Sequence, residues 1–174
     1  CLKDYLDHAE DETLVIFLDA YDVMALEPLR DIRSRFLMLG STIVFSGEVS
    51  SAPDGVAELL YTSCAGGTEA KFPYLNSGSI IGLVKHMRVM VGEVWEDVQL
   101  HQGRFTGNPL DIEDQRWFTR WYLRTCLDDT DLTIDAKIGP GSDAQSPQPS
   151  QPRAVAVVDH DALLFHTMHR MSPH

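Results

Sequence analysis

The hydrophobic positions of the chain change their spacing from one segment to the next. Residues 14–18, LVIFL, are all apolar, a pattern typical of a central strand buried on both faces of a parallel sheet. A helix is predicted next, because Pro28 suits its first position, Gly40 suits its end, and apolar residues recur at helical spacing at Leu29, Ile32, Phe36 and Leu39. Residues 42–45 form a second short strand, so the order strand, helix, strand predicts a right-handed βαβ unit.

The rest of the chain continues this alternation. Apolar positions predict a strand at 79–84 and an amphipathic helix with Met87, Met90, Val94 and Val98 on its inner face. A further helix is expected at 111–126, with inner positions at Phe118, Trp121, Tyr122 and Cys126. Short strands are expected at 132–134, 154–158 and 162–165, and the acidic segment before residue 14 reads as a solvated helix end and loop. The pattern predicts an α/β fold whose sheet is mixed and mainly parallel, flanked by helices.

Length and composition favour one soluble domain. The 174 residues fit a single domain over 1–174, with a flexible insertion rich in Pro, Ser and Gln at 139–153. No apolar run approaches the roughly 18 residues that span a bilayer. The chain begins at Cys1 without an initiator Met or a signal-peptide pattern, so we expect a fragment that lacks its N-terminal part.

Charge and cysteine content limit the classes of partner. The net charge is −12, which argues against nucleic acid, because binding to phosphate backbones needs clustered Lys and Arg. An acidic protein that binds a diphosphate needs a divalent cation between its carboxylates and the phosphates. The three cysteines, Cys1, Cys64 and Cys126, fit neither a zinc site nor a disulfide framework. Either one disulfide with a free thiol or three free thiols agrees with them.

The first candidate site follows the apolar run at 14–18. Asp19 and Asp22 converge only if the chain turns directly after Asp19, since residues three apart on a strand point to opposite faces. Two carboxylates at the end of a strand suit Mg²⁺ or Mn²⁺, and Tyr21 between them suits packing on a nucleobase. A helix-capping role for either Asp explains the same residues. An Asp-nucleophile phosphatase of the haloacid dehalogenase type is a rival interpretation. In those phosphatases the second Asp lies two residues after the first, whereas Asp22 lies three residues after Asp19.

Four further segments carry candidate polar groups. Residues 74–78, YLNSG, offer Asn76 and Ser77 for sugar hydroxyls, with Gly78 permitting close backbone approach, although Asn-Ser-Gly alone is usually a turn. Glu48 ends the segment VFSGE, where a loop acid facing water is the simpler interpretation. The acids near 111–115 suit the first turn of a helix by its dipole. His166 follows an apolar run and is a candidate metal ligand, although a structural role is more usual for a lone His.

These segments, taken in order, resemble the glycosyltransferase domain of the procollagen lysyl hydroxylases and related collagen glucosyl- and galactosyltransferases. That family shows Thr-Asp-Ser-Tyr-Asp-Val after its strand, where this chain has 18–23, LDAYDV. The family's Val-Phe-Ser-Ala-Glu corresponds to 44–48, its Tyr-Leu-Asn-Ser-Gly to 74–78, and its Asp-Asp-Gln helix to 113–115, EDQ. The family's Leu-Asp strand end corresponds to Ile134 and Asp135. The resemblance covers about residues 12–135 strongly.

The resemblance implies a GT-A fold, Rossmann-like and here N-terminally incomplete, that binds a UDP-sugar with Mn²⁺ or Mg²⁺. By analogy the metal ligands are Asp19, Asp22 and His166, while Tyr21, Ser77 and Gly78 contact the nucleotide sugar. Catalytic and acceptor positions are assigned by analogy to Asn76, Glu113, Asp114 and Gln115. The implied reaction moves glucose or galactose to a protein or glycan acceptor, for example a collagen-like hydroxylysine. The implied compartment is the lumen of the endoplasmic reticulum or Golgi.

Departures from the family pattern keep alternatives open. Thr167 and Met168 follow His166 where the family has Gly and Asn, so His169 competes for the role of third ligand. The family's Ile-Phe-Gln after the Leu-Asp strand end is replaced by the insertion. One alternative is therefore a degenerate, non-catalytic module that binds a sugar nucleotide, and another is a glycosyltransferase fragment that is inactive by itself.

Overall fold

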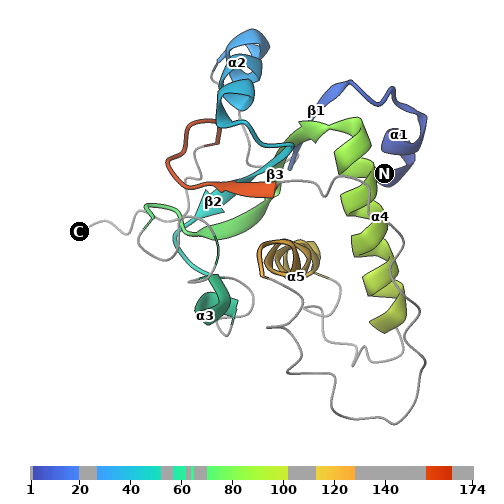
Figure 1. Ribbon diagram of the computed structural model, residues 1–174, viewed down its shortest axis with the longest axis vertical. Helices are drawn as coiled ribbons and strands as arrows, with labels where there is room; N and C mark the ends of the chain where they lie inside the picture. The colour runs from blue at the N-terminus through green and yellow to red at the C-terminus, as the bar shows by residue number, and fades with distance from the viewer. Residues whose placement is uncertain are drawn as a thin grey trace.

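The computed structural model describes residues 2–19, 27–51, 57–61, 64, 70–101, 113–127 and 156–165. Two layers of helices enclose one sheet in this part of the chain, with α2 on one side and the other helices on the opposite side (Figure 1). In chain order the elements are α1 (Leu2–His8), β1 (Leu14–Leu18), α2 (Leu29–Leu39), β2 (Ile43–Glu48), α3 (Glu58–Tyr61), β3 (Tyr74–Leu83), α4 (Val84–His101), α5 (Asp114–Cys126) and β4 (Ala156–Asp159).

The sheet has four strands in the order β1-β3-β2-β4. β3 runs antiparallel to both β1 and β2, and β2 runs parallel to β4. The mixed α/β class is therefore confirmed and is compatible with a Rossmann-like glycosyltransferase fragment, but two of the three described pairings are antiparallel, against the expectation of a mainly parallel sheet. β1 and β2 run in the same direction and are connected through α2, as a βαβ unit requires. However, β3 lies between them in the sheet.

β1 is an edge strand of the described sheet, whereas its continuous apolar run predicted a central strand. It pairs with β3 alone among the described residues, and its burial alternates only weakly along the strand. Leu18 at its end is 38% exposed. A continuous apolar run indicates burial but not which neighbours supply it, and here α2 and α4 cover parts of the two faces.

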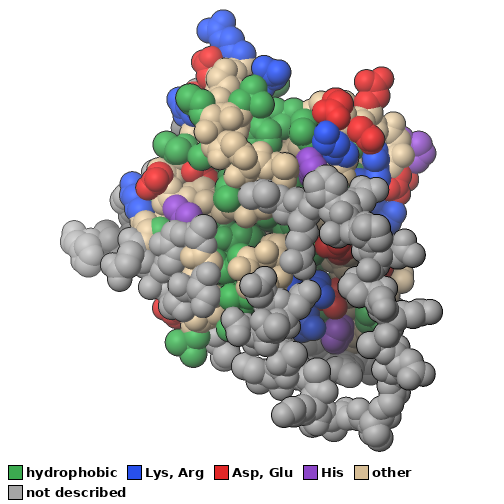
Figure 2. Space-filling view, in the orientation of Figure 1, with side chains coloured by type: hydrophobic (Ala, Val, Ile, Leu, Met, Phe, Trp, Pro, Cys, Tyr) green, Lys and Arg blue, Asp and Glu red, His purple; other side chains and the backbone are tan. Residues whose placement is uncertain are grey.

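Each face of the sheet packs on its own apolar cluster. On one face, Val44 and Ile81 pack with Phe36 of α2. Gly40 ends α2 with φ 65°, a left-handed conformation that favours glycine. Leu29 was expected inside but is 69% exposed, because α2 contacts the sheet mainly through the positions around Phe36. Figure 2 shows apolar side chains exposed over this helix.

The opposite face carries the larger core, formed with α1, α3, α4 and α5. The predicted inner positions of α4 and α5 are confirmed as buried or partly buried. Phe45 of β2 lies among three rings of α5, with centroids 5.9 Å from Phe118, 6.3 Å from Trp121 and 6.4 Å from Tyr122. α4 and α5 are also joined by ion pairs. The Asp97 carboxylate of α4 lies 2.9 Å from the Arg120 guanidinium and 3.2 Å from that of Arg124, both on α5.

α1 is a helix where the sequence suggested only a helix end and loop. Arg88 of α4 fixes it, because its guanidinium donates to the carbonyls of Leu6 and Ala9 and pairs with Asp11 at 2.6 Å. Figure 2 shows charged side chains gathered on the surface over this part of the chain. A distant arginine therefore ends α1 and sets the turn that leads into β1.

The C-terminal part of the sheet differs from the sequence prediction. β4 is confirmed, but 162–165 forms a turn instead of a strand. The reason is Asp159, whose buried carboxylate accepts N–H groups from Leu163, Leu164 and Phe165 at 2.6–2.8 Å. The predicted strand at 132–134 and the insertion at 139–153 lie outside the described residues.

Two cysteines left open by the sequence are paired. Cys64 and Cys126 form a disulfide with their Cα atoms 5.5 Å apart, so the bridge links the segment after α3 to the end of α5. Within the described segments, no helix has the length and apolar character that crossing a membrane requires.

Candidate functional site

A break in strand pairing creates the candidate site. Phe45 of β2 pairs with Ile80 of β3, but the next residue, Ser46, pairs with Asn76. Residues 77–79 therefore have no partner on β2, and β3 bulges at the Ser-Gly-Ser sequence. Bulges of this kind commonly occur beside active sites, since they redirect side chains and backbone groups. The Asn-Ser-Gly segment, for which a turn was the simpler interpretation, is thus part of an irregular strand, and we call 77–79 the bulge.

The side chain of Asn76 holds the bulge in shape. Its Oδ1 accepts the Gly78 N–H at 2.9 Å and the Ser46 hydroxyl at 3.1 Å, while its Nδ2 donates to Glu48 at 3.3 Å. The amide thus bonds groups on both β2 and β3. A short amide side chain that bonds a backbone N–H two residues ahead is the usual way for Asn to stabilise a tight bend.

Glu48 is the centre of this hydrogen-bonded network. It is 3% exposed, so the interpretation of a loop acid facing water was wrong. Its carboxylate accepts Asn76 Nδ2 at 3.3 Å and Gln115 Nε2 at 2.5 Å. A buried carboxylate is tolerated only where donors replace its hydration, and these two amides supply that replacement. Glu48 therefore joins β2, β3 and the start of α5.

The start of α5 contacts the bulge from the other side. Gln115 Oε1 accepts the Ser77 N–H at 3.3 Å, and Asp114 Oδ1 accepts the Ser77 hydroxyl at 3.2 Å. Asp114 is exposed and lies in the first turn of the helix, where a negative charge interacts favourably with the helix dipole. Glu113 precedes the helix, and its Oε2 is buried without a hydrogen bond from any described residue.

Asp19 reaches the bulge from the end of β1. Its N–H donates to the carbonyl of Gly78 at 2.8 Å, which extends the pairing of β1 and β3 by one residue. A Cβ at Gly78 would lie 3.2 Å from Asp19 Oδ2 and 3.0 Å from Asn76 Oδ1, so only glycine fits comfortably between these side chains. Asp19 is exposed, and it does not cap α2, which begins ten residues later with Pro28 at its N-cap.

The structure thus gathers six of the predicted site residues around one bulge. They are Asn76, Ser77, Gly78, Asp19, Asp114 and Gln115, from three elements far apart in sequence. Tyr21, Asp22 and His166 lie outside the described residues. Among the residues that are described, no cluster of three or more His, Cys, Asp or Glu could hold a metal ion.

Sequence reasoning assigned no site role to Ser46, and it did not identify Asp159. Ser46 donates to both the carbonyl and the side chain of Asn76, at 3.0 and 3.1 Å. Asp159 lies directly beside Ser46 in the β2–β4 register and fixes the turn that precedes His166. The only signal for Ser46 was its place next to Glu48, and Asp159 followed an apolar strand in the same way as Asp19.

The amide groups of Asn76 and Gln115 mainly support the site from within. Each amide uses both its oxygen and its nitrogen in hydrogen bonds inside the network. The carboxylates of Asp19 and Asp114 are instead exposed at its surface. Such an arrangement, exposed oxygens on a rigid polar base, can bind a hard cation or sugar hydroxyls.

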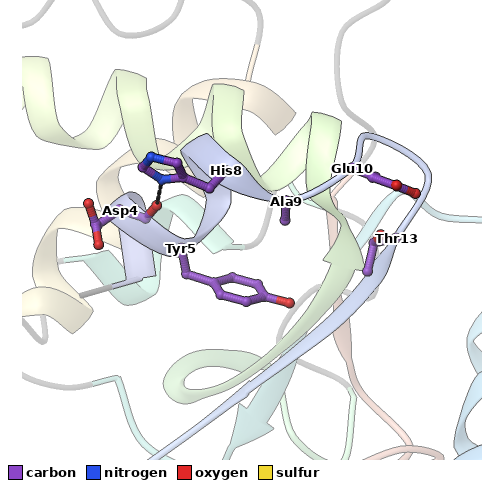
Figure 3. Close-up of a pocket in the computed structure, with 6 residues that line it drawn as sticks. All are labelled: Asp4, Tyr5, His8, Ala9, Glu10 and Thr13. Carbon is purple, nitrogen blue, oxygen red and sulfur yellow. Dashed lines mark hydrogen bonds between the residues drawn. The ribbon is translucent and has the colours of Figure 1, made fainter.

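A surface hollow beside α1 is separate from this site (Figure 3). Its volume is about 570 Å³, and its lining residues are Asp4, Tyr5, His8, Ala9, Glu10 and Thr13. His8 Nδ1 lies 2.8 Å from the Asp4 carbonyl, across one turn of α1. Thr13 precedes β1 whereas Asp19 follows it, so the strand separates the hollow from the bulge by roughly 17 Å.

Comparison with known proteins places the candidate site within one family match. The family model described as the PLOD GT domain matches residues 1–138, which include every described site residue except Asp159. A procollagen-lysine,2-oxoglutarate 5-dioxygenase of Drosophila melanogaster is 30% identical over 137 residues, covering 79% of this chain and 16% of that protein. Human procollagen-lysine,2-oxoglutarate 5-dioxygenase 1 is 36% identical over 124 residues, covering 70% of this chain and 15% of that protein.

A third relative carries the glycosyltransferase activity in its name. The human multifunctional procollagen lysine hydroxylase and glycosyltransferase LH3 is 29% identical over 138 residues, covering 78% of this chain and 16% of that protein. The chain thus spans about a sixth of the length of these curated relatives. From the match over 1–138 and the motifs gathered at the bulge, we conclude that this chain belongs to the PLOD GT domain family, a family of glycosyltransferase domains.

Proposed function

We propose that this chain forms part of a metal-dependent hexosyltransferase site, which moves glucose or galactose from a UDP-sugar to a hydroxylysine-type or sugar hydroxyl. The observation that carries the proposal is the network around Glu48. It brings the three separate family motifs, at 44–48, 74–78 and 113–115, to the exposed carboxylate of Asp19. Motifs that are distant in sequence and joined in space by hydrogen bonds act as one site.

The donor atoms around Asp19 fit a hard divalent cation. Asp19 offers an exposed carboxylate at a strand end, and Asp114 offers a second at the surface of the same network. Oxygen donors of this kind suit Mn²⁺ or Mg²⁺. Asp19 would hold the ion, with Asp22 and His166 as proposed partners, and a bound ion would offset the charge that develops on the departing diphosphate.

The remaining residues of the network would position the sugar. The bulge presents Ser77 and Gly78 to a ligand, and the absence of a Cβ at Gly78 lets a ligand approach the backbone beside Asp19. Glu113, Asp114 and Gln115 start α5 next to the bulge, so they are proposed to face the sugar and the acceptor. Rigid positioning of two reactants accounts for much of the rate enhancement in group transfer, and the buried hydrogen bonds of Glu48 supply that rigidity.

The compartment proposed for this activity is the lumen of the endoplasmic reticulum or Golgi. The relatives carry procollagen in their names, and the Cys64–Cys126 disulfide is suited to an oxidising environment. The acceptor class proposed here, a hydroxylysine of a collagen-like chain, comes from the same relatives and is part of the proposal.

Calorimetric titration of UDP-glucose and UDP-galactose, with and without Mn²⁺, tests the donor site. We expect binding that depends on Mn²⁺ and falls at least about 100-fold in Asp19→Asn, because the substitution removes a charged metal ligand without changing its size. The matched control is Asp31→Asn, a partly exposed Asp in the first turn of α2, which should leave binding unchanged.

Three outcomes would change the interpretation. Binding without release of UDP in the presence of acceptor peptides would favour a non-catalytic binding module, the alternative suggested by Thr167 and Met168. Equal affinity in the native chain and in Asp19→Asn would remove Asp19 from the metal site. Phosphate release from simple phosphomonoesters, abolished by Asp19→Asn, would instead favour the Asp-nucleophile phosphatase.

A further inference from the structure

The disulfide closes a loop that contains most of the candidate site. Cys64 and Cys126 are 62 residues apart in sequence, and the loop between them includes β3, α4 and the start of α5. Cys64 is buried within the larger core, and Cys126 is the last residue of α5. Both the bulge and Gln115 therefore lie inside the covalently closed segment.

Two stacked tyrosines join the same parts of the chain as the disulfide, namely α3 and α5. Tyr61 lies three residues before Cys64 and is joined to it by the Cys64 N–H, which donates to the Tyr61 carbonyl at 3.1 Å. Tyr122 lies about one turn before Cys126 on α5. The rings of Tyr61 and Tyr122 stack with centroids 5.9 Å apart and planes inclined by 29°. The disulfide and the stacked rings thus hold α3 against α5 at two successive levels.

Tyr61 carries this connection into the strand that forms the bulge. Its hydroxyl accepts the N–H of Leu75 at 3.1 Å, and Leu75 directly precedes Asn76. β1 stops at Leu18, which pairs with Ser79, so β1 does not extend alongside Leu75, whose neighbour on the other side of β3 is Gly47 of β2. Burial raises the pKa of Tyr61, and the oxygen of its hydroxyl accepts the Leu75 N–H. Its ring also meets Tyr74 edge-on at 5.2 Å.

We propose that the Cys64–Cys126 disulfide is a redox-sensitive clamp on the bulge, acting through Tyr61. With the disulfide intact, Tyr61 is held against Tyr122 and fixes Leu75, and Leu75 sets the position from which Asn76 shapes the bulge. When the disulfide is reduced, α3 is held to α5 only by non-covalent contacts, and the backbone at Leu75 gains freedom. The inference rests on the proposed donor site only where it concerns sugar-nucleotide affinity.

The redox step has a defined stoichiometry. A dithiol gives two electrons and two protons to the disulfide, the S–S bond breaks, Cys64 and Cys126 become thiols, and the dithiol becomes a cyclic disulfide. The reverse step requires a disulfide oxidant such as oxidised glutathione, which leaves as two thiols. Cys1 is the remaining cysteine, so the native chain should carry one free thiol and the reduced chain three.

Three measurements on the full chain test the clamp. Peptide mass mapping should find residues 64 and 126 in one linked fragment that dithiothreitol separates. Amide chemical shifts should then change on reduction at Leu75, while those of Ile81 in the regular part of β3 stay in place. Native chemical shifts do not report global stability, so a disulfide that only stabilised the fold would leave Leu75 unmoved. The affinity for UDP-glucose with Mn²⁺ should fall about tenfold on reduction, the loss expected from one backbone hydrogen bond.

The variant Tyr61→Phe keeps the ring stack and the disulfide but removes the hydroxyl from Leu75. We expect it to lower affinity about tenfold in the oxidised chain, with less than about a twofold further loss on reduction, because both changes act on one connection. Cys1→Ser is the control that leaves the disulfide intact, and it should behave like the native chain.

Each result either supports the proposed clamp or overturns it. An unlinked pair in mass mapping, an unmoved Leu75 amide, or independent effects of Tyr61→Phe and reduction would each overturn the clamp. If the reduced chain unfolds, Tyr61→Phe in the oxidised chain decides alone, through the Leu75 shift and the affinity. If no UDP-sugar binds in either redox state while the Leu75 amide still responds to reduction, the donor site fails and the clamp stands.

Discussion

The two halves of β2 are equally buried but are built on opposite principles. Residues 43–45, Ile-Val-Phe, and residues 46–48, Ser-Gly-Glu, are all buried. The first half pairs regularly with β3 and packs apolar side chains on both faces of the sheet. The second half faces the bulge and buries a hydroxyl and a carboxylate. Burial alone therefore does not distinguish core from site, and the boundary between them is the register shift between Phe45 and Ser46.

The difference follows from how each kind of side chain gains stability. Apolar groups are stabilised by leaving water in almost any close-packed arrangement. Buried polar groups lose their hydration and are tolerated only where specific partners replace it. Glu48 and Ser46 have such partners in Asn76 and Gln115. The polar half is thus more demanding in geometry, and we expect changes there to affect ligand binding as well as stability.

The largest expected effect tests the apolar half. Phe45→Ala should lower the free energy of unfolding by about 3–5 kcal/mol, since it removes a ring packed among three rings of α5. Urea denaturation followed by fluorescence measures the change. The variant that remains folded should bind UDP-sugar within about twofold of the native chain, as independent sites do. A greater loss of affinity would show that the two halves are coupled.

Replacing the carboxylate tests the polar half. Glu48→Ala should cost about 2–4 kcal/mol of stability, because it leaves the buried amide donors of Asn76 and Gln115 without their acceptor. It should also abolish measurable UDP-sugar binding. Glu48→Gln, which keeps the size and one acceptor oxygen, should fall between this variant and the native chain in both measurements. A stability loss in Glu48→Ala with full affinity would contradict the assignment.

Two glycines of β3 offer a matched pair for the comparison. A Cβ at Gly78 would approach Asn76 Oδ1 to 3.0 Å, and a Cβ at Gly82 would approach Met87 Cγ and the Thr42 carbonyl to 3.0 Å. Overpacking of this degree typically costs about 1–3 kcal/mol. We expect similar stability losses by urea denaturation in Gly78→Ala and Gly82→Ala, but a loss of donor affinity only in Gly78→Ala. Equal affinities would separate the bulge from the binding site.

The smallest effect concerns the hydroxyl of Ser46. Ser46→Ala should cost about 1 kcal/mol, since it removes one donor from the carbonyl and the side chain of Asn76. The amide would keep its bonds to Gly78 and Glu48, so affinity should fall by only a few-fold. Calorimetry with UDP-glucose measures the change, and a loss as large as that of Glu48→Ala would make Ser46 a direct contact.

The sequence predicted those local features that depend on residues within one short segment. The helices around Phe36, Met90 and Trp121 follow from apolar spacing, and Gly40 ends α2 as expected. The resemblance found in ordered motifs also led to the family now confirmed over residues 1–138. Each of these conclusions depends on residues close together in the chain or on their order.

Other features depended on neighbours that the sequence does not specify. The run at 14–18 was apolar enough for a central strand, yet β1 lies at the edge because β3 takes the place beside β2. The expected strand at 162–165 is a turn because the Asp159 carboxylate binds three of its N–H groups. In both places a long-range contact outweighed a local preference, as is common for strands.

By itself, the sequence determined the class of fold, the inner faces of α4 and α5 and the family, because periodicity and motif order are properties of the chain alone. Only the tertiary structure decided that Glu48 is buried, that Cys64 joins Cys126, and that Asn76 and Gln115 support the site from within. The physical reason is that the burial of a polar group and the pairing of a thiol both depend on a partner side chain. Here each partner lies many residues away in the chain.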